Sequence, residues 1–110
     1  MSELNAAMVR ATSPSWPERA RAGRDLAAFV DVPEAADAVL RLLLDAEDTA
    51  VTRQTAEALA RAGTVAAVRL IAQAFTEADG NQADWIQIGV QDALADGAPP
   101  DAAAVVDLRS

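Results

Sequence analysis

Apolar residues recur along the chain every three or four positions, which is the spacing of one face of an α-helix. This spacing stops at clusters of Pro, Gly, Asp and Asn, and such clusters mark loops. No stretch alternates apolar and polar residues as a half-buried β-strand would. The pattern therefore predicts an all-α protein with seven helices, at about residues 3–11, 15–30, 33–44, 49–62, 64–76, 84–96 and 101–108.

Local signals fix several of the predicted helix ends. Asp48 or Thr49 is expected to cap the fourth helix, and Gly63 to end it. The sixth helix is expected to begin at Asp84, as its N-cap, which leaves residues 77–84 as a linker. Its acidic residues lie around Gly80, but they lack the ligand spacing of a Ca²⁺-binding loop, so we interpret the segment as a turn.

The helices repeat in pairs. Alignment of Leu26, Leu59 and Leu94 brings three helices into one register, with steps of 33 and 35 residues, and the helices that follow them also align. Each unit is a helical hairpin that buries both of its apolar faces only when it stacks on a neighbour. The chain is thus predicted to be a single domain, residues 1–110, with repeats at 15–45, 48–76 and 84–108 and a capping helix at 1–12.

The second unit carries a recognisable motif. It reads Asp, then Val-x-Arg, then Ala-x-x-Leu, then Gly before a second apolar helix, at Asp48, Val51, Arg53, Ala56, Leu59 and Gly63. In this it resembles the HEAT-repeat family, in particular the short, Ala-rich bacterial form. The other two units are looser copies, with Ala20 and Ile88 at the Arg position. The resemblance implies a right-handed α-solenoid of about three hairpins that serves as a scaffold or binding surface.

The amino-acid composition excludes most catalytic mechanisms. The 110 residues include no Cys, His or Tyr, and all nine cations are Arg. Zinc sites of thiolate and imidazole, His-activated nucleophiles, Schiff-base lysines and Lys-dependent phosphate loops are therefore excluded. We expect no catalytic residue, no cofactor and no metal, and hence no enzyme.

Charge and hydropathy limit the classes of partner that the protein is expected to bind. Seventeen acidic residues against nine Arg give a net charge of −8 and a pI of about 4.3, which disfavours nucleic acid and favours a basic or neutral protein. The chain shows neither the basic start of a signal peptide nor an apolar run long enough for a membrane span, so we expect a cytoplasmic protein with no membrane partner.

The resemblance also suggests where a partner would bind. In such a solenoid the second helix of each hairpin lines the concave face, so its polar positions are the candidate contacts, although a solvated helix face has the same pattern. These positions are Glu34, Asp37, Arg41, Arg69, Gln73 and Asp107. Trp16 and Trp85, each in the first turn of a repeat, are expected to pack between stacked units rather than to form a binding hot spot.

Other functions stay open at this point. The chain is predicted to be a non-catalytic protein-interaction module, and a narrower alternative is a small acidic immunity protein or antitoxin that masks a basic toxin. A carboxylate-based small-molecule binder or enzyme is a second alternative, because acidic pairs are the only catalytic apparatus that the composition permits. The last helix ends with Val105, Val106 and Leu108 and no polar cap, so we also expect either a homodimer through this helix or a frayed C terminus.

Overall fold

The computed structural model describes residues 2–109, with the side chains of residues 2–107. The described residues form helices and no strands. The α-helices are α1 (Glu3–Arg10), α2 (Trp16–Leu26), α3 (Pro33–Leu43), α4 (Thr49–Ala62), α5 (Val65–Glu77), α6 (Gly80–Ala95) and α7 (Ala103–Arg109). Two short 3₁₀ turns, η1 (Ala27–Phe29) and η2 (Pro100–Ala102), adjoin α2 and α7.

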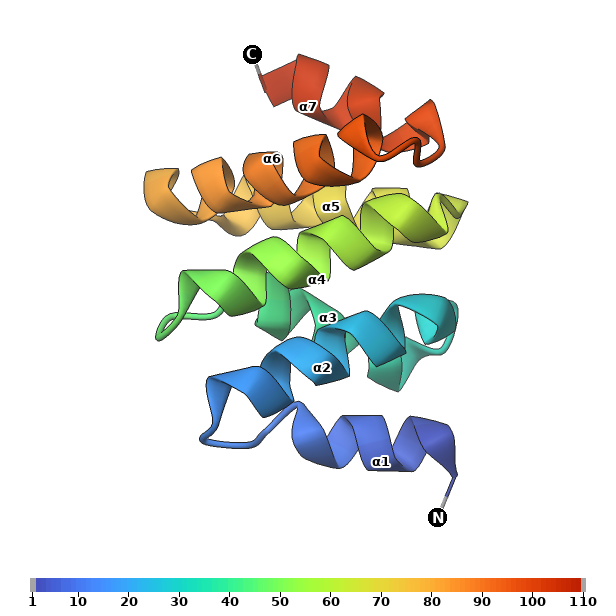
Figure 1. The fold of residues 1–110 in the computed structure, drawn as a ribbon, viewed down its shortest axis with the longest axis vertical. Coiled ribbons are helices and arrows are strands. Elements are labelled where there is room, and N and C mark those ends of the chain that lie inside the picture. The colour runs from blue at the N-terminus through green and yellow to red at the C-terminus, as the bar shows by residue number, and fades with distance from the viewer. Residues whose placement is uncertain (1, 110) are drawn as a thin grey trace.

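The helices stack along the long axis of a molecule that measures 40 × 26 × 23 Å. Figure 1 shows α1 at one end of the stack and α7 at the other, with α2, α4 and α6 in one layer and α3 and α5 behind it. The expected α-solenoid is thereby confirmed, and α1 covers one end of it as the sequence predicted. The right-handed sense of the superhelix and the repeat boundaries stay predictions.

The core lies between the two layers. It is built from aliphatic side chains that are fully buried, each contributing about 1.5–3 kcal/mol relative to an exposed position. The largest are Leu26, Val39, Leu43, Leu59, Ile71 and Ile86. Numerous buried alanines fill the remaining space, so neighbouring helices lie close together.

Two glycines show how close the first-layer helices are. A Cβ on Gly89 of α6 would lie 2.3 Å from the backbone oxygen of Arg53 in α4, and a Cβ on Gly23 of α2 would lie 2.1 Å from Thr55 Oγ1. Only glycine leaves room for these approaches. A third glycine, Gly63, ends α4 in the left-handed conformation with φ of 62°, as the sequence predicted.

The predicted start of α6 is wrong. The helix begins at Gly80, because Asp79 forms a capping box: its carboxylate accepts from the Gln82 backbone N–H at 2.7 Å, and the Gln82 side chain accepts from the Asp79 N–H at 3.0 Å. Such a box satisfies two backbone donors at once and fixes the helix start there. Asp84 therefore lies within the helix, and the supposed linker is mostly helical.

The tryptophans also differ from expectation. Trp16 is 43 % exposed and Trp85 is half-buried, so the expectation of core packing is wrong for Trp16. Trp16 lies in the first turn of α2, whereas Trp85 lies in the second turn of α6 because that helix begins at Gly80. In α7, Val105 and Val106 are buried, while the Leu108 side chain lies outside the described part. The homodimer through this helix stays a prediction.

Candidate binding groove

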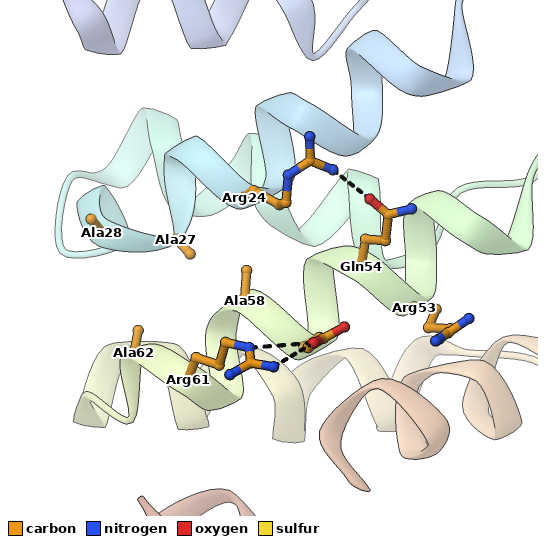
Figure 2. Close-up of a pocket in the computed structure, with 9 residues that line it drawn as sticks. Arg24, Ala27, Ala28, Arg53, Gln54, Ala58, Arg61 and Ala62 are labelled. Carbon is orange, nitrogen blue, oxygen red and sulfur yellow. Dashed lines mark hydrogen bonds and ion pairs between the residues drawn. The ribbon is translucent and has the colours of Figure 1, made fainter. Parts of the chain in front are cut away.

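A groove of about 620 Å³ opens on the outer side of the first layer, between α2 with η1 and α4. Its apolar part consists of four alanines, namely Ala27, Ala28, Ala58 and Ala62. Its polar part consists of Arg24, Arg53, Gln54, Glu57 and Arg61. Figure 2 shows Ala27, Ala28 and Arg24 on the α2 side, opposite the side chains of α4. The other three hollows described are smaller, at about 180, 330 and 270 Å³.

The repeat register explains why the groove opens at this junction. Between α4 and α6, ion pairs bridge the helices: Arg53 to Asp92 at 2.9 Å and Arg61 to Asp96 at 2.6 Å. The residue that corresponds to Arg61 one repeat of 33 residues earlier is Ala28, in η1. Because alanine neither reaches across nor fills the gap, the α2–α4 junction stays open at its C-terminal end.

Arg61 is fully engaged within the protein. Besides Asp96 it contacts Glu57, one turn earlier on α4, at 2.8 Å. The hydrogen bonds that Arg61 donates, first to Glu57 and then to Asp96, raise the pKa of its guanidinium above the ordinary value. The charge of Arg61 is thus balanced by two carboxylates at the rim of the groove.

Arg24 is paired differently. Its guanidinium donates to the side-chain carbonyl of Gln54, as Figure 2 shows, and among the described residues it forms no ion pair. In the register of the repeats, Arg24 stands where α4 has Glu57 and α6 has Asp92. At this position α2 therefore has a cation where α4 and α6 have an acid. The partner of this cation is the neutral amide of Gln54.

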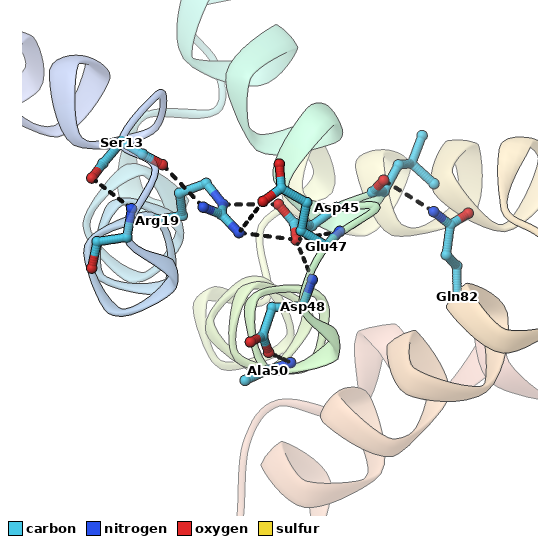
Figure 3. A network of polar contacts seen from close by, with 9 residues as sticks. Ser13, Arg19, Asp45, Glu47, Asp48, Ala50 and Gln82 are labelled. Atoms are coloured by element: carbon cyan, nitrogen blue, oxygen red, sulfur yellow. Dashed lines mark hydrogen bonds and ion pairs between the residues drawn. The ribbon is translucent and has the colours of Figure 1, made fainter.

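A second polar cluster lies at the opposite end of α2 and is structural. Arg19 donates to the Asp45 carboxylate at 2.9 Å and to the Ser13 carbonyl at 3.0 Å, and the side chains of this ion pair are only 9 % and 10 % exposed. Asp45 also accepts from the backbone N–H groups of Glu47 and Asp48 (Figure 3). A nearly buried carboxylate such as Asp45 is the group that a catalytic interpretation would select. Here its contacts instead link α2 to the loop before α4.

Most of the residues predicted to bind a partner lie on the second layer, and one lies on α7 at the end of the stack (Figure 1). All six are exposed, three on α3 (Glu34, Asp37, Arg41), two on α5 (Arg69, Gln73) and one on α7 (Asp107). Arg69 lines a small hollow beside Val65 and Asp101, and Gln73 donates to Glu77 within α5. The structure brings none of the six into the α2–α4 groove. The signal that sequence reasoning missed is Arg24 at an acidic position, with Ala28 one turn after it.

Comparison with known families agrees with this architecture. A family model described as HEAT repeats matches residues 4–95. The chain belongs to the HEAT-repeat family. HEAT repeats generally mediate protein–protein interaction, and the family is typically non-catalytic. No curated protein and no solved structure matches this HEAT-repeat chain.

Two properties of the described residues bear on partners. None of the helices in residues 2–109 combines the length and the apolar character that crossing a membrane requires. The same residues hold no group of three or more acidic side chains placed to bind a metal ion.

Proposed function

We propose that this HEAT-repeat protein is a non-catalytic protein-interaction module whose partner places a segment of its chain in the α2–α4 groove. The groove supports this proposal because it is open, is lined by four alanines and is flanked by exposed arginines. Binding surfaces favour such a combination of apolar contact area and Arg. The single observation that carries the proposal is the junction that the repeat leaves unfilled at Ala28.

A second candidate places a basic or neutral partner on the layer of α3 and α5. The net charge of −8 favours it, as does the exposure of the five residues predicted on α3 and α5. A small acidic protein that masks a basic toxin is a narrower form of the same proposal. In this form the protein would cover the active surface of the toxin by charge complementarity.

The two candidates are separated by blocking each surface in turn. Ala58→Trp fills the groove, and Gln73→Trp places the same bulk on the exposed face of α5. Each tagged variant is used to recover partners from a lysate of the native cell, with quantitative mass spectrometry. We expect the groove variant to lose its stoichiometric partner and the α5 variant to retain it.

The reverse result would move the partner to the α3–α5 layer and contradict the groove proposal. Because Ala58 is half-buried, Ala28→Trp serves as a second groove variant at an exposed position. Circular dichroism at the temperature of the experiment shows that each variant is folded. If both folded groove variants retain the partner, the groove is not its binding site.

A further inference from the structure

We infer that the α2–α4 groove recognises an acidic side chain of the partner, flanked by apolar residues, and that Arg24 binds its carboxylate. This inference rests on the proposed function and adds the chemistry of the partner. It starts from the charge of the groove: three arginines and one carboxylate line it, although the whole chain has nearly twice as many acids as cations.

Arg24 is the cation in the groove whose charge the protein leaves unbalanced. Arg53 contacts Asp92 at 2.9 Å, and Arg61 contacts Glu57 and Asp96. On the other side of α2, Arg10 of α1 contacts Asp25 at 2.7 Å. At the α1–α2 and α4–α6 junctions, the arginines that reach across therefore contact a carboxylate. At the α2–α4 junction, the only contact of the Arg24 guanidinium among the described residues is with the amide of Gln54.

A carboxylate from the partner fits the position that this pattern leaves empty. The planar guanidinium presents several N–H donors in a fork that matches the two oxygens of a carboxylate. The amide carbonyl of Gln54 uses one of these donors, and the Arg24 side chain is exposed, so other donors are accessible to a partner that occupies the groove. Ala27, Ala28 and Ala58 provide apolar surface for the neighbouring residues of the segment.

The overall negative charge does not prevent this recognition. Screening limits the repulsion between exposed charges to about 8 Å at physiological ionic strength, so contacts inside the groove decide the local preference. The partner as a whole can carry a positive charge and still present one acidic side chain to Arg24.

Selection from a random peptide library displayed on phage tests the inference. We expect the wild-type protein to enrich peptides with Asp or Glu between apolar residues, and Arg24→Gln to lose this preference. Arg21→Gln is the matched control, because it removes a cation one turn earlier on α2, outside the groove. For an enriched peptide, replacement of its acid by the amide should weaken binding to the wild type about tenfold and leave binding to Arg24→Gln unchanged.

A carboxylate within the protein provides a second test. Gln54→Glu places an acid beside Arg24 and should compete with the peptide, so its affinity for the peptide falls. Gln91→Glu adds the same charge at an exposed position on α6 and should have little effect. Equal losses in both variants would show general repulsion and overturn the inference.

The outcomes separate the inference from the proposed function. If wild type and Arg24→Gln enrich the same peptides, and Ala58→Trp and Ala28→Trp bind none of them, the groove binds a segment but the carboxylate assignment is wrong. If the peptides bind all these variants equally, the groove is not the binding site and the proposed function fails as well. Enrichment of no peptide by the wild type also overturns the inference.

Discussion

The two junctions of the first layer are built differently, although both join helices of the same repeat register. At α4–α6, Gly89 lets the helices meet, and two inter-helix ion pairs cover the contact. At α2–α4, Gly23 likewise permits a close approach, but beyond it the chain turns into η1 with Ala27 and Ala28. Ion pairs span the first junction, whereas the second opens into a groove.

This difference shows that small residues have opposite effects in different places. Where the backbones of neighbouring helices touch, a small residue removes the space between them. Where the backbones diverge, the same small residue leaves a gap that no side chain fills. A HEAT-like stack can therefore form a groove where one repeat has Ala in place of Arg and a 3₁₀ turn in place of the end of the helix.

The largest expected effect concerns the end of α2 opposite the groove. Arg19→Met should lower the free energy of unfolding by about 3 kcal/mol, because it leaves the Asp45 carboxylate without its cation at a nearly buried position. Chemical denaturation measures this loss. The control is Arg21→Met, whose side chain is 58 % exposed and whose loss should cost under about 1 kcal/mol. Equal costs for the two variants would contradict the anchoring role of Arg19.

Closure of the α4–α6 junction is tested by Gly89→Ala. The new Cβ would meet the backbone oxygen of Arg53, which cannot move without shifting α4, so we expect a loss of about 1–3 kcal/mol in the free energy of unfolding. Gly80→Ala is the matched control, since nothing lies within 4 Å of a Cβ there. Thermal denaturation of both variants checks the prediction. Stabilisation by Gly89→Ala would show that the helices are not in contact.

The close approach of α2 to α4 at Gly23 should tolerate an added Cβ better than the approach of α6 to α4 at Gly89. Gly23→Ala meets the side chain of Thr55 rather than backbone, and a side chain can rotate, so its cost should be smaller than that of Gly89→Ala. In a Thr55→Ala background the cost of Gly23→Ala should fall further, because Oγ1 and Cγ2, two of the three Thr55 atoms that the Cβ meets, have been removed. A double-mutant cycle by denaturation measures this coupling. Additive effects would contradict the contact.

The smallest expected effect is on the polar contact across the groove. Gln54→Glu converts the Arg24–Gln54 hydrogen bond into an ion pair like those at α4–α6, and should stabilise the fold by about 0.2–1 kcal/mol at low salt. The gain should disappear at high salt, because exposed ion pairs are screened. Gln91→Glu should show no such gain. Destabilisation by Gln54→Glu at low salt would contradict the contact between the side chains of Arg24 and residue 54.

Much of the fold could be predicted from the sequence because local and repeat signals agreed. The apolar spacing predicted the helices, and the register of Leu26, Leu59 and Leu94 predicted an α-solenoid. The start of α6 was missed because Asp84 and Asp79 are both acceptable caps, and only the reciprocal bond with Gln82 favours Asp79. Exposed Trp16 was missed because burial depends on the neighbouring unit, which local spacing does not reveal.

The groove was harder to predict than the fold. Family resemblance directs attention to the second helices, whereas this groove arises from a difference between repeats in the first helices. Its signals, Ala28 at the register position of Arg61 and Arg24 at that of Glu57, are visible only when the units are compared residue by residue for charge and size. Which side chains then remain unpaired depends on distances across the junction.

Site-specific photo-crosslinking in the native cell tests the central claim, that a partner occupies the open junction. A benzophenone amino acid is introduced in place of Arg53, whose exposed side chain lines the groove, and, separately, at Gln73 on α5 and at Gln91 on α6. We expect one dominant protein adduct from position 53 that decreases when Arg24→Gln is added. An adduct from Gln73 alone would place the partner on the α3–α5 layer and contradict the account.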